Sequence, residues 1–516
     1  MIEKKHITNS VKNIAVGITY QVFTIVSNFV LRTVFVRILG PDYLGLSSLF
    51  TNIISVMSIS EMGIGSAIIY SMYKPLATKD YPMVAKLINY YRLLYRNIAF
   101  FIGVAGILVL PFLRFIINLD TDIQYLYIYY FFYVIEAVSS YLFIYKSSIL
   151  TAAQENYILL QGQLTFSIIK FVLQILSLLV LQSFFLYLVI QVTCNILFNV
   201  WGNNVSGKRY PFINERLYLE QGAKKEIWNN IKSMFSYKLG GIILNNTDMI
   251  LISVLVDTRT VGLFSNYKMP ISAISTMLSS VFTGIQASIG DLNVFSTEKE
   301  KKRLFDIIDI FVFVIYSFFT VCFCNILPVF VEIWLGKDYL IDNINLYIYA
   351  ITFYFTGILY PIWEFRETVG LFKQTKYIMY IAGGINLLLS IVWGNKYGLQ
   401  GILLATVIAR LCTNLWYEPY KLFSIYFKDS VWKYYVRQVV RFTLMILMLV
   451  TSNIIQNCIL INCNILKMLI YFLVDFLTIF LILFLYLIKN PEMKTIINIA
   501  KIFFHRMKFK RKKQKR

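Results

Sequence analysis

The apolar residues of the chain fall in repeated blocks of about 20–28 residues, separated by short polar segments. An α-helix rises about 1.5 Å per residue, so a block of this length can cross a hydrocarbon layer about 30 Å thick. The pattern therefore predicts fourteen membrane-spanning helices. Their expected ranges are 13–39, 43–72, 87–113, 123–150, 158–181, 183–201, 231–256, 260–288, 304–330, 343–363, 376–393, 398–420, 438–457 and 466–488.

The composition excludes an ordinary soluble protein. Of the 516 residues, 58% are hydrophobic and 15% are charged, and the mean hydropathy is +0.65. Soluble domains carry about 25% charged residues. No segment between the expected spans is long enough for a further folded domain, which counts against an external catalytic domain. The sequence therefore indicates an all-α integral membrane protein.

Two stretches of the first half recur in the second half. "RILGPDYLGLSSLF" (37–50) is similar to "VLVDTRTVGLFSNY" (254–267), which aligns Gly45 with Gly262. A second pair, 150–176 and 368–392, aligns Tyr157 with Tyr377 at nearly the same offset. Because six spans separate the copies, they share one topology and form a parallel repeat. Transporters built in this way bind substrate between the repeats, near the membrane midplane.

The repeat and the longest connecting segment together predict the domain organisation. The expected parts are an N-terminal six-helix lobe (1–202), a basic cytoplasmic linker (203–230), a C-terminal six-helix lobe (231–425), two additional transmembrane helices (426–490) and a basic cytoplasmic tail (491–516).

Lysine and arginine are unevenly distributed between the two membrane sides. If the N-terminus is inside, about 39 of the 49 lie on the cytoplasmic side. This excess follows the positive-inside rule and predicts that both termini are cytoplasmic. We interpret the net charge of +22 and the basic run 505–516 as orientation signals that also contact anionic lipid headgroups. No aromatic platform or folded basic domain supports nucleic-acid binding.

Few residues are suited to metal or covalent chemistry. The six cysteines lie in or beside spans, and the two histidines, His6 and His505, lie in the termini. This pattern favours cysteines that pack as small apolar residues, and the chain has no Walker A sequence. We expect no metal site and no cofactor, and coupling to an ion gradient or to the membrane potential stays open.

Three charged residues are expected at a similar depth in the membrane. Arg32, Asp248 and Lys268 lie seven or eight residues from the outer ends of equivalent spans of the two repeats. A charge near the bilayer centre costs about 2.5–3.5 kcal/mol on insertion scales, so such residues commonly mark substrate or ion pathways. Two cations and one acid leave a local positive excess. That excess suits a phosphate or pyrophosphate, which arginine binds with two hydrogen bonds.

Five further charged residues also have a structural interpretation. Lys170, Arg410, Glu136 and Asp475 are expected near the midplane, where they could pair with one another. Glu61 is followed by the small residues of "MGIGSA" and could form hydrogen bonds where helices pack closely.

Several segments together are similar to one known family. They are "VRILGPDYLGLSSLFTNIISVMSISEMGIGSAI" (36–68), "NNTDMILISVLVDTRTVGLFSNYKM" (245–269), "SIGDL" (288–292), "SILTAAQENY" (148–157) and "RETVGLFKQTKY" (366–377). With them the chain resembles the polysaccharide flippase branch of the multidrug/oligosaccharidyl-lipid/polysaccharide (MOP) exporter superfamily, the Wzx-type translocases. The resemblance implies two six-helix bundles in a V-shaped exporter architecture, followed by two further helices. It also implies a cationic cavity lined by spans 1, 2, 7 and 8, and an apolar groove for the lipid tail at the last two spans. The charged residue Asp475 in the last span does not fit a purely apolar groove.

The resemblance implies a flippase for undecaprenyl-diphosphate-linked oligosaccharide repeat units. Such a protein would move its cargo from the inner to the outer leaflet of the bacterial plasma membrane by alternating access, for capsule, O-antigen or other surface polysaccharide. Arg32 and Lys268 would bind the diphosphate or acidic sugars, and Asp248 and Glu61 would pair with them in the empty cavity. The candidate substrate-binding residues are Arg32, Lys268, Glu61, Asp248, Arg410 and Lys170.

The expected partners are the lipid-linked glycan, membrane lipids, and a polysaccharide polymerase with glycosyltransferases, and the chain is expected to be a monomer. Two other functions stay open. A cation-coupled multidrug antiporter of the same superfamily would favour a cavity with excess acid. A membrane polysaccharide polymerase or ligase would be an enzyme and would need a large external loop, whereas a flippase performs no covalent chemistry.

Overall fold

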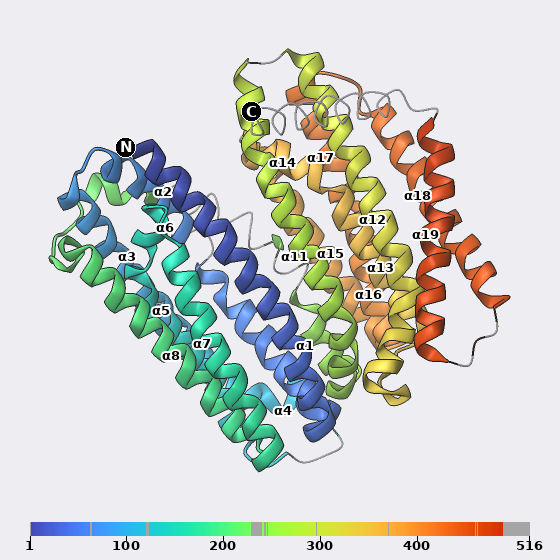
Figure 1. The fold of residues 1–516 in the computed structure, drawn as a ribbon, viewed down its shortest axis with the longest axis horizontal. Coiled ribbons are helices and arrows are strands. Elements are labelled where there is room, and N and C mark those ends of the chain that lie inside the picture. The colour runs from blue at the N-terminus through green and yellow to red at the C-terminus, as the bar shows by residue number, and fades with distance from the viewer. Residues whose placement is uncertain are drawn as a thin grey trace, which may run out of the picture. The chain divides into compact units, whose positions relative to one another are not determined.

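The computed structural model consists of α-helices joined by short turns (Figure 1). It describes residues 2–488 except 62–63, 120–122, 226, 229–239, 242–243, 245, 296, 370, 460 and 462. Internal contacts divide the chain into two compact units. The first unit comprises residues 1–265 and 383–402, and the second comprises residues 266–382 and 403–516.

The first unit begins with a helix that is interrupted once. Gly40, with φ of 82° and ψ of −179°, breaks α1 just before Pro41. Glycine adopts a positive φ without steric cost, and proline lacks the amide hydrogen that would continue the helix. The helices of this unit are α1 (Ile2–Met57), α2 (Ile64–Ala77), α3 (Tyr81–Val109), α4 (Leu113–Ile116), α5 (Leu126–Phe143), α6 (Ser148–Ala152), α7 (Tyr157–Leu176), α8 (Phe184–Arg209) and α10 (Asp248–Leu255).

The second unit is centred on α12, whose apolar membrane-spanning part is mostly buried. A capping box of Thr297 and Glu300 starts this helix, and Gly336, with φ of 103°, ends it. The helices lying wholly in this unit are α12 (Glu298–Leu335), α13 (Asn343–Ile358), α14 (Tyr360–Val369), α17 (Asn414–Leu422), α18 (Trp432–Asn457) and α19 (Asn464–Ile488). The boundary between the units falls within α11 (Thr258–Phe295), α15 (Phe372–Tyr397) and α16 (Leu399–Cys412).

The helices agree with the predicted spans. Within the described residues, 11 helical stretches are long and apolar enough to cross a membrane. One of them, 15–57, covers nearly all of the first predicted span and the first half of the second because it includes the break at Gly40, and α2 covers the end of the second. Residues 231–239, 242–243 and 245 of the predicted span 231–256 lie outside the described residues, and α10 covers its end. α8 continues to Arg209, so the first residues after position 202 are helical. The predicted all-α membrane architecture is confirmed.

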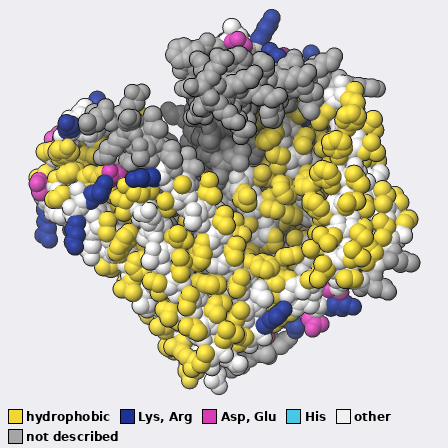
Figure 2. All heavy atoms as spheres, in the orientation of Figure 1, with side chains coloured by type: hydrophobic (Ala, Val, Ile, Leu, Met, Phe, Trp, Pro, Cys, Tyr) yellow, Lys and Arg dark blue, Asp and Glu magenta, His cyan; other side chains and the backbone are white. Residues whose placement is uncertain are grey.

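Large apolar side chains are exposed on the helices. Phe115, Phe100 and Val180 are 80%, 75% and 73% exposed, respectively. Figure 2 shows hydrophobic side chains across most of the described surface, with Lys and Arg gathered towards its margins. Exposed apolar surface of this extent would be unfavourable in water but is stable against lipid. The chain is a multi-pass membrane protein.

The two repeated Gly-Leu motifs contact each other within the first unit. A Cβ at Gly45 would lie 2.1 Å from the carbonyl oxygen of Thr258, and a Cβ at Gly262 would lie 2.5 Å from the carbonyl oxygen of Pro41. Thr258 is the counterpart of Pro41 at the same offset that aligns Gly262 with Gly45. The contact is therefore reciprocal, as in an interface with two-fold symmetry. A reciprocal contact between equivalent positions is expected for a parallel repeat, because its two copies are related by a two-fold axis.

Hydrogen bonds between Asn118 and residues 256 and 258 hold one side of this crossing. After α4, the amide of Asn118 donates to Thr258 Oγ1 at 3.0 Å, and the amide of Thr258 donates to the carbonyl oxygen of Asn118 at 2.8 Å. Asn118 Nδ2 also donates to the carbonyl oxygen of Val256 at 3.0 Å. These bonds fix the start of α11 against the segment that follows α4, within the first unit.

Candidate functional site

Arg32 is held against the start of α11. It lies two turns before the break at Gly40 and is partly buried. Its Nη2 donates to Ser265 Oγ, and Ser265 Oγ donates to the carbonyl oxygen of Gly262 at 2.7 Å. The Arg32 guanidinium is therefore linked, through Ser265, to the place where the Gly45 and Gly262 motifs contact each other.

A stripe of polar side chains on α8 lies next to Arg32. Tyr187 interacts electrostatically with both Arg32 and Glu136. Gln191 Nε2 and Asn195 Nδ2 donate to the Glu136 carboxylate at 2.7 and 3.0 Å. Positions 187, 191 and 195 recur every four residues and therefore share one helix face. This four-residue spacing is the sequence signal for the stripe, and none of the three residues is among the predicted site residues.

Lys170 lies at the other end of this stripe. It lines a small cavity of about 140 Å³ together with Glu136 and Asn195. The cavity is also lined by Tyr20, Gln163, Phe166, Ser167, Cys194 and Phe198. The structure thus brings Arg32, Glu136 and Lys170 to one polar stripe of the first unit. Two cations and several neutral donors along one surface can hydrogen-bond to an anionic ligand.

Glu61 makes hydrogen bonds between helices. It ends a short 3₁₀ turn, Ser58–Glu61, between α1 and α2. The hydroxyls of Tyr95 on α3 and Tyr141 on α5 donate to its two carboxylate oxygens at 2.6 and 2.8 Å. This arrangement matches the packing interpretation of Glu61. Its predicted role in pairing with Arg32 or Lys268 stays a prediction.

The remaining candidates are divided between the units. Asp248 is the first residue of α10 in the first unit, where a carboxylate is favourable because of the helix dipole. Lys268 lies on α11 in the second unit and is partly buried. Arg410, on α16 in the second unit, is 3% exposed and interacts electrostatically with Tyr360. A cavity shared by Arg32, Asp248 and Lys268 stays a prediction.

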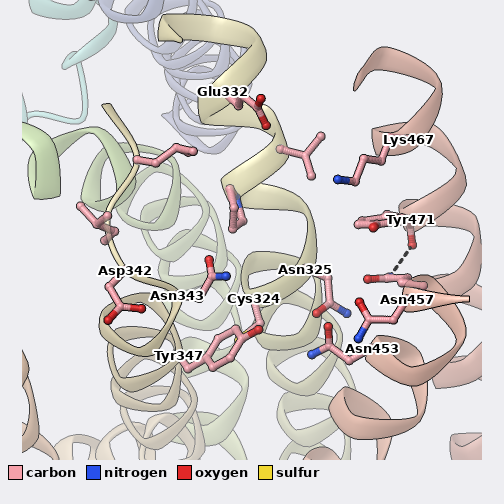
Figure 3. A pocket seen from close by; sticks show the side chains of 15 residues that line it. Cys324, Asn325, Glu332, Asp342, Asn343, Tyr347, Asn453, Asn457, Lys467 and Tyr471 are labelled. Carbon is pink, nitrogen blue, oxygen red and sulfur yellow. Dashed lines mark hydrogen bonds between the residues drawn. The ribbon is translucent and has the colours of Figure 1, made fainter. Parts of the chain in front are cut away.

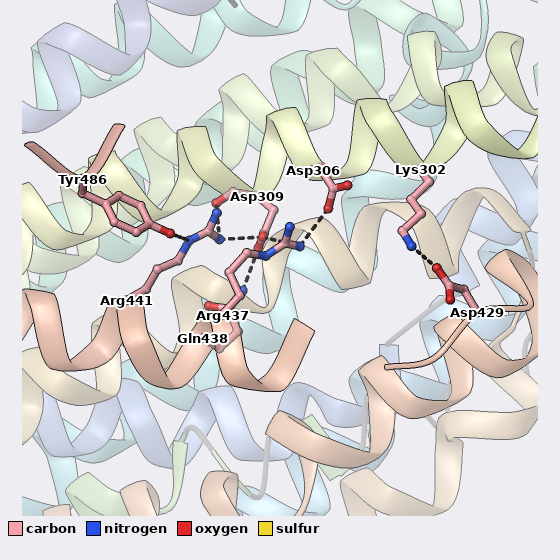
Figure 4. Close-up of polar contacts among 8 residues, drawn as sticks. All are labelled: Lys302, Asp306, Asp309, Asp429, Arg437, Gln438, Arg441 and Tyr486. Carbon is pink, nitrogen blue, oxygen red and sulfur yellow. Dashed lines mark hydrogen bonds and ion pairs between the residues drawn. The ribbon is translucent and has the colours of Figure 1, made fainter. Parts of the chain in front are cut away.

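A buried ionic cluster in the second unit was not expected (Figure 4). Arg441 Nη1 donates to Asp309 Oδ2 at 2.5 Å, and Arg437 Nη2 lies 2.8 Å from Asp306 and 3.0 Å from Asp309. Arg441 is 0% exposed and Asp309 is 1% exposed. Neither arginine is among the site residues predicted from the sequence. Two acids three residues apart on α12 face two arginines four residues apart on α18, but the sequence does not indicate that these two helices pack together.

Two further buried acids are neutralised by arginine. In the first unit, Arg209 Nε and Nη2 donate to Glu155 at 2.5 and 2.9 Å. Burial, followed by the hydrogen bond to Glu155, raises the pKa of Tyr210 to about 12. In the second unit, Arg366 Nη1 donates to Glu418 at 2.9 Å, and both side chains are buried. These pairs stabilise helix packing.

A polar cavity of about 420 Å³ opens between α12, α13, α18 and α19. Figure 3 shows the carboxamides of Asn325, Asn453 and Asn457 close together in it. Asn325 Nδ2 and Gln456 Nε2 donate to Asp475 Oδ1 at 2.7 and 2.8 Å, and the Ser452 hydroxyl donates to the same oxygen. Asp475 therefore accepts hydrogen bonds from three neutral donors, and neither Lys170 nor Arg410 is among these donors. This end of α18 and α19 is polar where the resemblance implied an apolar groove.

Solved structures share the fold. An inward-closed structure of the lipid II flippase MurJ has a TM-score of 0.64 and 16% sequence identity, covering 92% of this chain and 98% of that chain. A MOP superfamily transporter from Pyrococcus furiosus has a TM-score of 0.51 and 12% identity, covering 83% and 97% of the two chains. A bent form of the MATE transporter VcmN from Vibrio cholerae has a TM-score of 0.50 and 13% identity, covering 80% and 97%. These similarities show the fold of the MOP superfamily.

Sequence comparison gives the family. Curated protein sequences contain no match to the chain. Residues 10–289, more than half of the chain, match the family described as "Polysaccharide biosynthesis protein". The chain belongs to this polysaccharide biosynthesis protein family.

Proposed function

We propose that the protein is a flippase for undecaprenyl-diphosphate-linked oligosaccharide repeat units. It moves them from the inner to the outer leaflet of the bacterial plasma membrane by alternating access, for capsular or other surface polysaccharide. The observation that carries this proposal is Arg32, a partly buried guanidinium within an apolar span, beside a stripe of neutral donors. Family membership and the fold shared with a lipid II flippase support it.

In this proposal, basic side chains bind the negatively charged part of the substrate. Arg32 and Lys268 bind the diphosphate or acidic sugars, and Lys170 and Arg410 add positive charge deeper in the units. Arginine suits this role because its planar fork donates two parallel hydrogen bonds to phosphate. Asp248 balances the cations when no substrate is bound. Glu61 positions α2 against α3 and α5 through its two tyrosines.

The protein acts as a transporter and not as an enzyme, since flipping breaks no covalent bond. Both termini are cytoplasmic, in accord with the distribution of lysine and arginine. The protein works as a monomer beside the glycosyltransferases that supply the lipid-linked glycan and the polymerase that consumes it.

A leaflet assay tests this function. Proteoliposomes would receive a labelled undecaprenyl-diphosphate oligosaccharide, and its accessibility on each side would be followed for wild type, Arg32→Gln and Arg37→Gln. Arg37 is a matched control because it lies on the same helix but is exposed. We expect flipping by wild type and Arg37→Gln and a loss of at least about tenfold in Arg32→Gln, because the variant loses a charge-assisted hydrogen-bond donor. Absence of flipping by wild type would refute the function, and normal flipping by Arg32→Gln would refute the site.

The second candidate is a cation-coupled multidrug antiporter. The observation that favours it is the carboxylate of Glu136, which lies within a span. Its described hydrogen-bond donors are the neutral amides of Gln191 and Asn195, and these do not compensate its charge. A carboxylate of this kind can bind a proton, a sodium ion or a cationic drug. Efflux of a cationic dye from the same proteoliposomes, lost in Glu136→Gln, would favour this function over flipping.

A further inference from the structure

A basic cavity in the first unit lies apart from the residues discussed above. It has a volume of about 280 Å³ and is formed by the first half of α3 and the segment that follows α8. Four cations line it: Arg92, Arg96, Arg216 and Lys224. The other described lining residues are Asn89, Tyr90, Leu93, Leu217, Tyr218 and Leu219, and none of these is a carboxylate.

The walls of this cavity are fixed by specific contacts. Asn89 Nδ2 on α3 donates to the carbonyl oxygens of Glu215 and Leu217 at 2.6 and 3.2 Å, which holds the segment after α8 against the helix. Leu219 is 5% exposed and packs into the apolar core of α3. The Lys224 ammonium lies 5.9 Å from the centre of the Tyr90 ring. The cations are therefore presented by an ordered surface.

The position of the cavity along α3 places it at a membrane boundary. Residues 97–113 carry no charge and are bracketed by Arg96 and Arg114. At about 1.5 Å per residue these two arginines are about 27 Å apart, close to the thickness of the hydrocarbon layer of about 30 Å. Arg92 and Arg96 therefore lie at the level of the lipid headgroups. The excess of lysine and arginine at this end assigns it to the inner leaflet.

An apolar stripe continues from the cavity towards the other leaflet. Leu93 lines the cavity, and Phe100 and Val104 follow on the same face of α3. Leu93, Phe100 and Val104 are 46%, 75% and 40% exposed, respectively. A lipid whose headgroup occupied the cavity could lay its hydrocarbon chain along this stripe.

We propose that this cavity binds the diphosphate of a polyprenyl-diphosphate lipid in the inner leaflet, as a loading site for the flippase. The inference rests on the proposed function for its choice of lipid. Four cations, with no carboxylate among the described lining residues, suit a diphosphate with two or three negative charges better than a phosphodiester with one. Three of the four are arginines, which bind phosphate oxygens through two parallel hydrogen bonds.

Binding of farnesyl diphosphate to the full-length protein in detergent tests the site. The variant Arg92→Gln/Arg96→Gln removes two exposed cations one turn apart on α3. The control Lys299→Gln/Arg303→Gln removes two exposed cations with the same spacing on α12, where neither lines this cavity. We expect saturable binding by wild type and control, and at least about tenfold weaker binding by the Arg92/Arg96 variant, since the variant loses two guanidinium groups that donate charge-assisted hydrogen bonds.

Two further arms separate the possible outcomes. Farnesol tests whether the diphosphate is needed, and phosphatidylglycerol tests whether any anionic lipid suffices. No binding by wild type, equal binding by all variants, binding of farnesol or displacement by equimolar phosphatidylglycerol would each overturn the proposal. The measurement requires no transport. If farnesyl diphosphate binds as expected but the leaflet assay shows no flipping, the proposed function fails and the diphosphate site stands.

Discussion

Replacing Gly262 by alanine tests whether the crossing of the repeated motifs constrains the fold. The new Cβ would lie 2.5 Å from the carbonyl oxygen of Pro41 and 2.9 Å from the amide nitrogen of Gly45. Both are backbone atoms, so the helices themselves must separate by several tenths of an ångström. Overpacking of this kind costs about 1–3 kcal/mol. The intrinsic preference of helices for alanine over glycine, about 1 kcal/mol, offsets part of that cost.

Gly384→Ala is a matched control for this substitution. Gly384 lies in α15, and a Cβ built there would have no atom within 4 Å. The control should gain the helix preference without a clash and become more stable by about 0.5–1 kcal/mol. The two variants should therefore differ by about 1–3 kcal/mol, the cost of overpacking alone.

Thermal unfolding of wild type and both variants in one detergent would measure this difference. We expect Gly262→Ala to unfold at a lower temperature than Gly384→Ala, and Gly384→Ala to unfold at or above the wild-type temperature. A Gly262→Ala protein that melted together with or above the control would show that a Cβ fits between the helices. The close contact would then not be a packing constraint.

Two further substitutions test the buried polar groups. Asp309→Leu should lower the free energy of unfolding by about 3–5 kcal/mol because it leaves Arg441 buried without its carboxylate. Adding Arg441→Leu should recover part of this loss, since the buried charge is then removed as well. A double variant as unstable as Asp309→Leu would contradict the pairing. Glu61→Leu should be about 1–3 kcal/mol less stable than Glu61→Gln because leucine leaves the hydroxyls of Tyr95 and Tyr141 without an acceptor. Melting curves of the four variants provide both comparisons, and identical curves for the two Glu61 variants would refute the second.

The hydrophobic pattern was sufficient to predict most of the spans, and the internal repeat aligned two residues that the structure shows in contact. The internal repeat aligned Gly45 with Gly262, and the structure places each against the equivalent neighbour of the other. The reason is physical. A short residue repeated at equivalent positions permits close helix approach, and a two-fold arrangement brings the equivalent positions together.

Side-chain partners could not be predicted in the same way. Asp309 and Arg441 lie far apart in the sequence, and no periodicity within either helix indicates which helices pack together. Glu136 illustrates the same limit, because Gln191 and Asn195 carry no charge that would mark them as its partners. Hydropathy shows that a charged residue lies within a span. Which side chains donate hydrogen bonds to it depends on which face a neighbouring helix turns towards it.

The α18–α19 hairpin should move with α12 as one body. Two buried polar clusters join the hairpin to α12, through Asp309 with Arg441 and through Asn325 with Asp475. Asp309 and Asn325 are sixteen residues apart in α12, or about 24 Å along the helix axis. A helix pair attached at two such distant points cannot tilt against α12 without separating one cluster. Removing one partner from a buried ion pair costs about 3–5 kcal/mol, so such tilting is unfavourable.

Spin labels at Glu332 on α12 and Asn457 on α18 would measure this motion across the mouth of the polar cavity. We expect one narrow distance distribution that is the same with and without undecaprenyl diphosphate, since the clusters below the mouth stay intact. A second label pair, at Glu332 and Asn343 on α13, serves as a reference within the same cavity wall. If only the distance to Asn457 changed with the lipid, the hairpin would open independently of α12. The polar clusters would then be a latch for a lipid-tail groove rather than a permanent attachment.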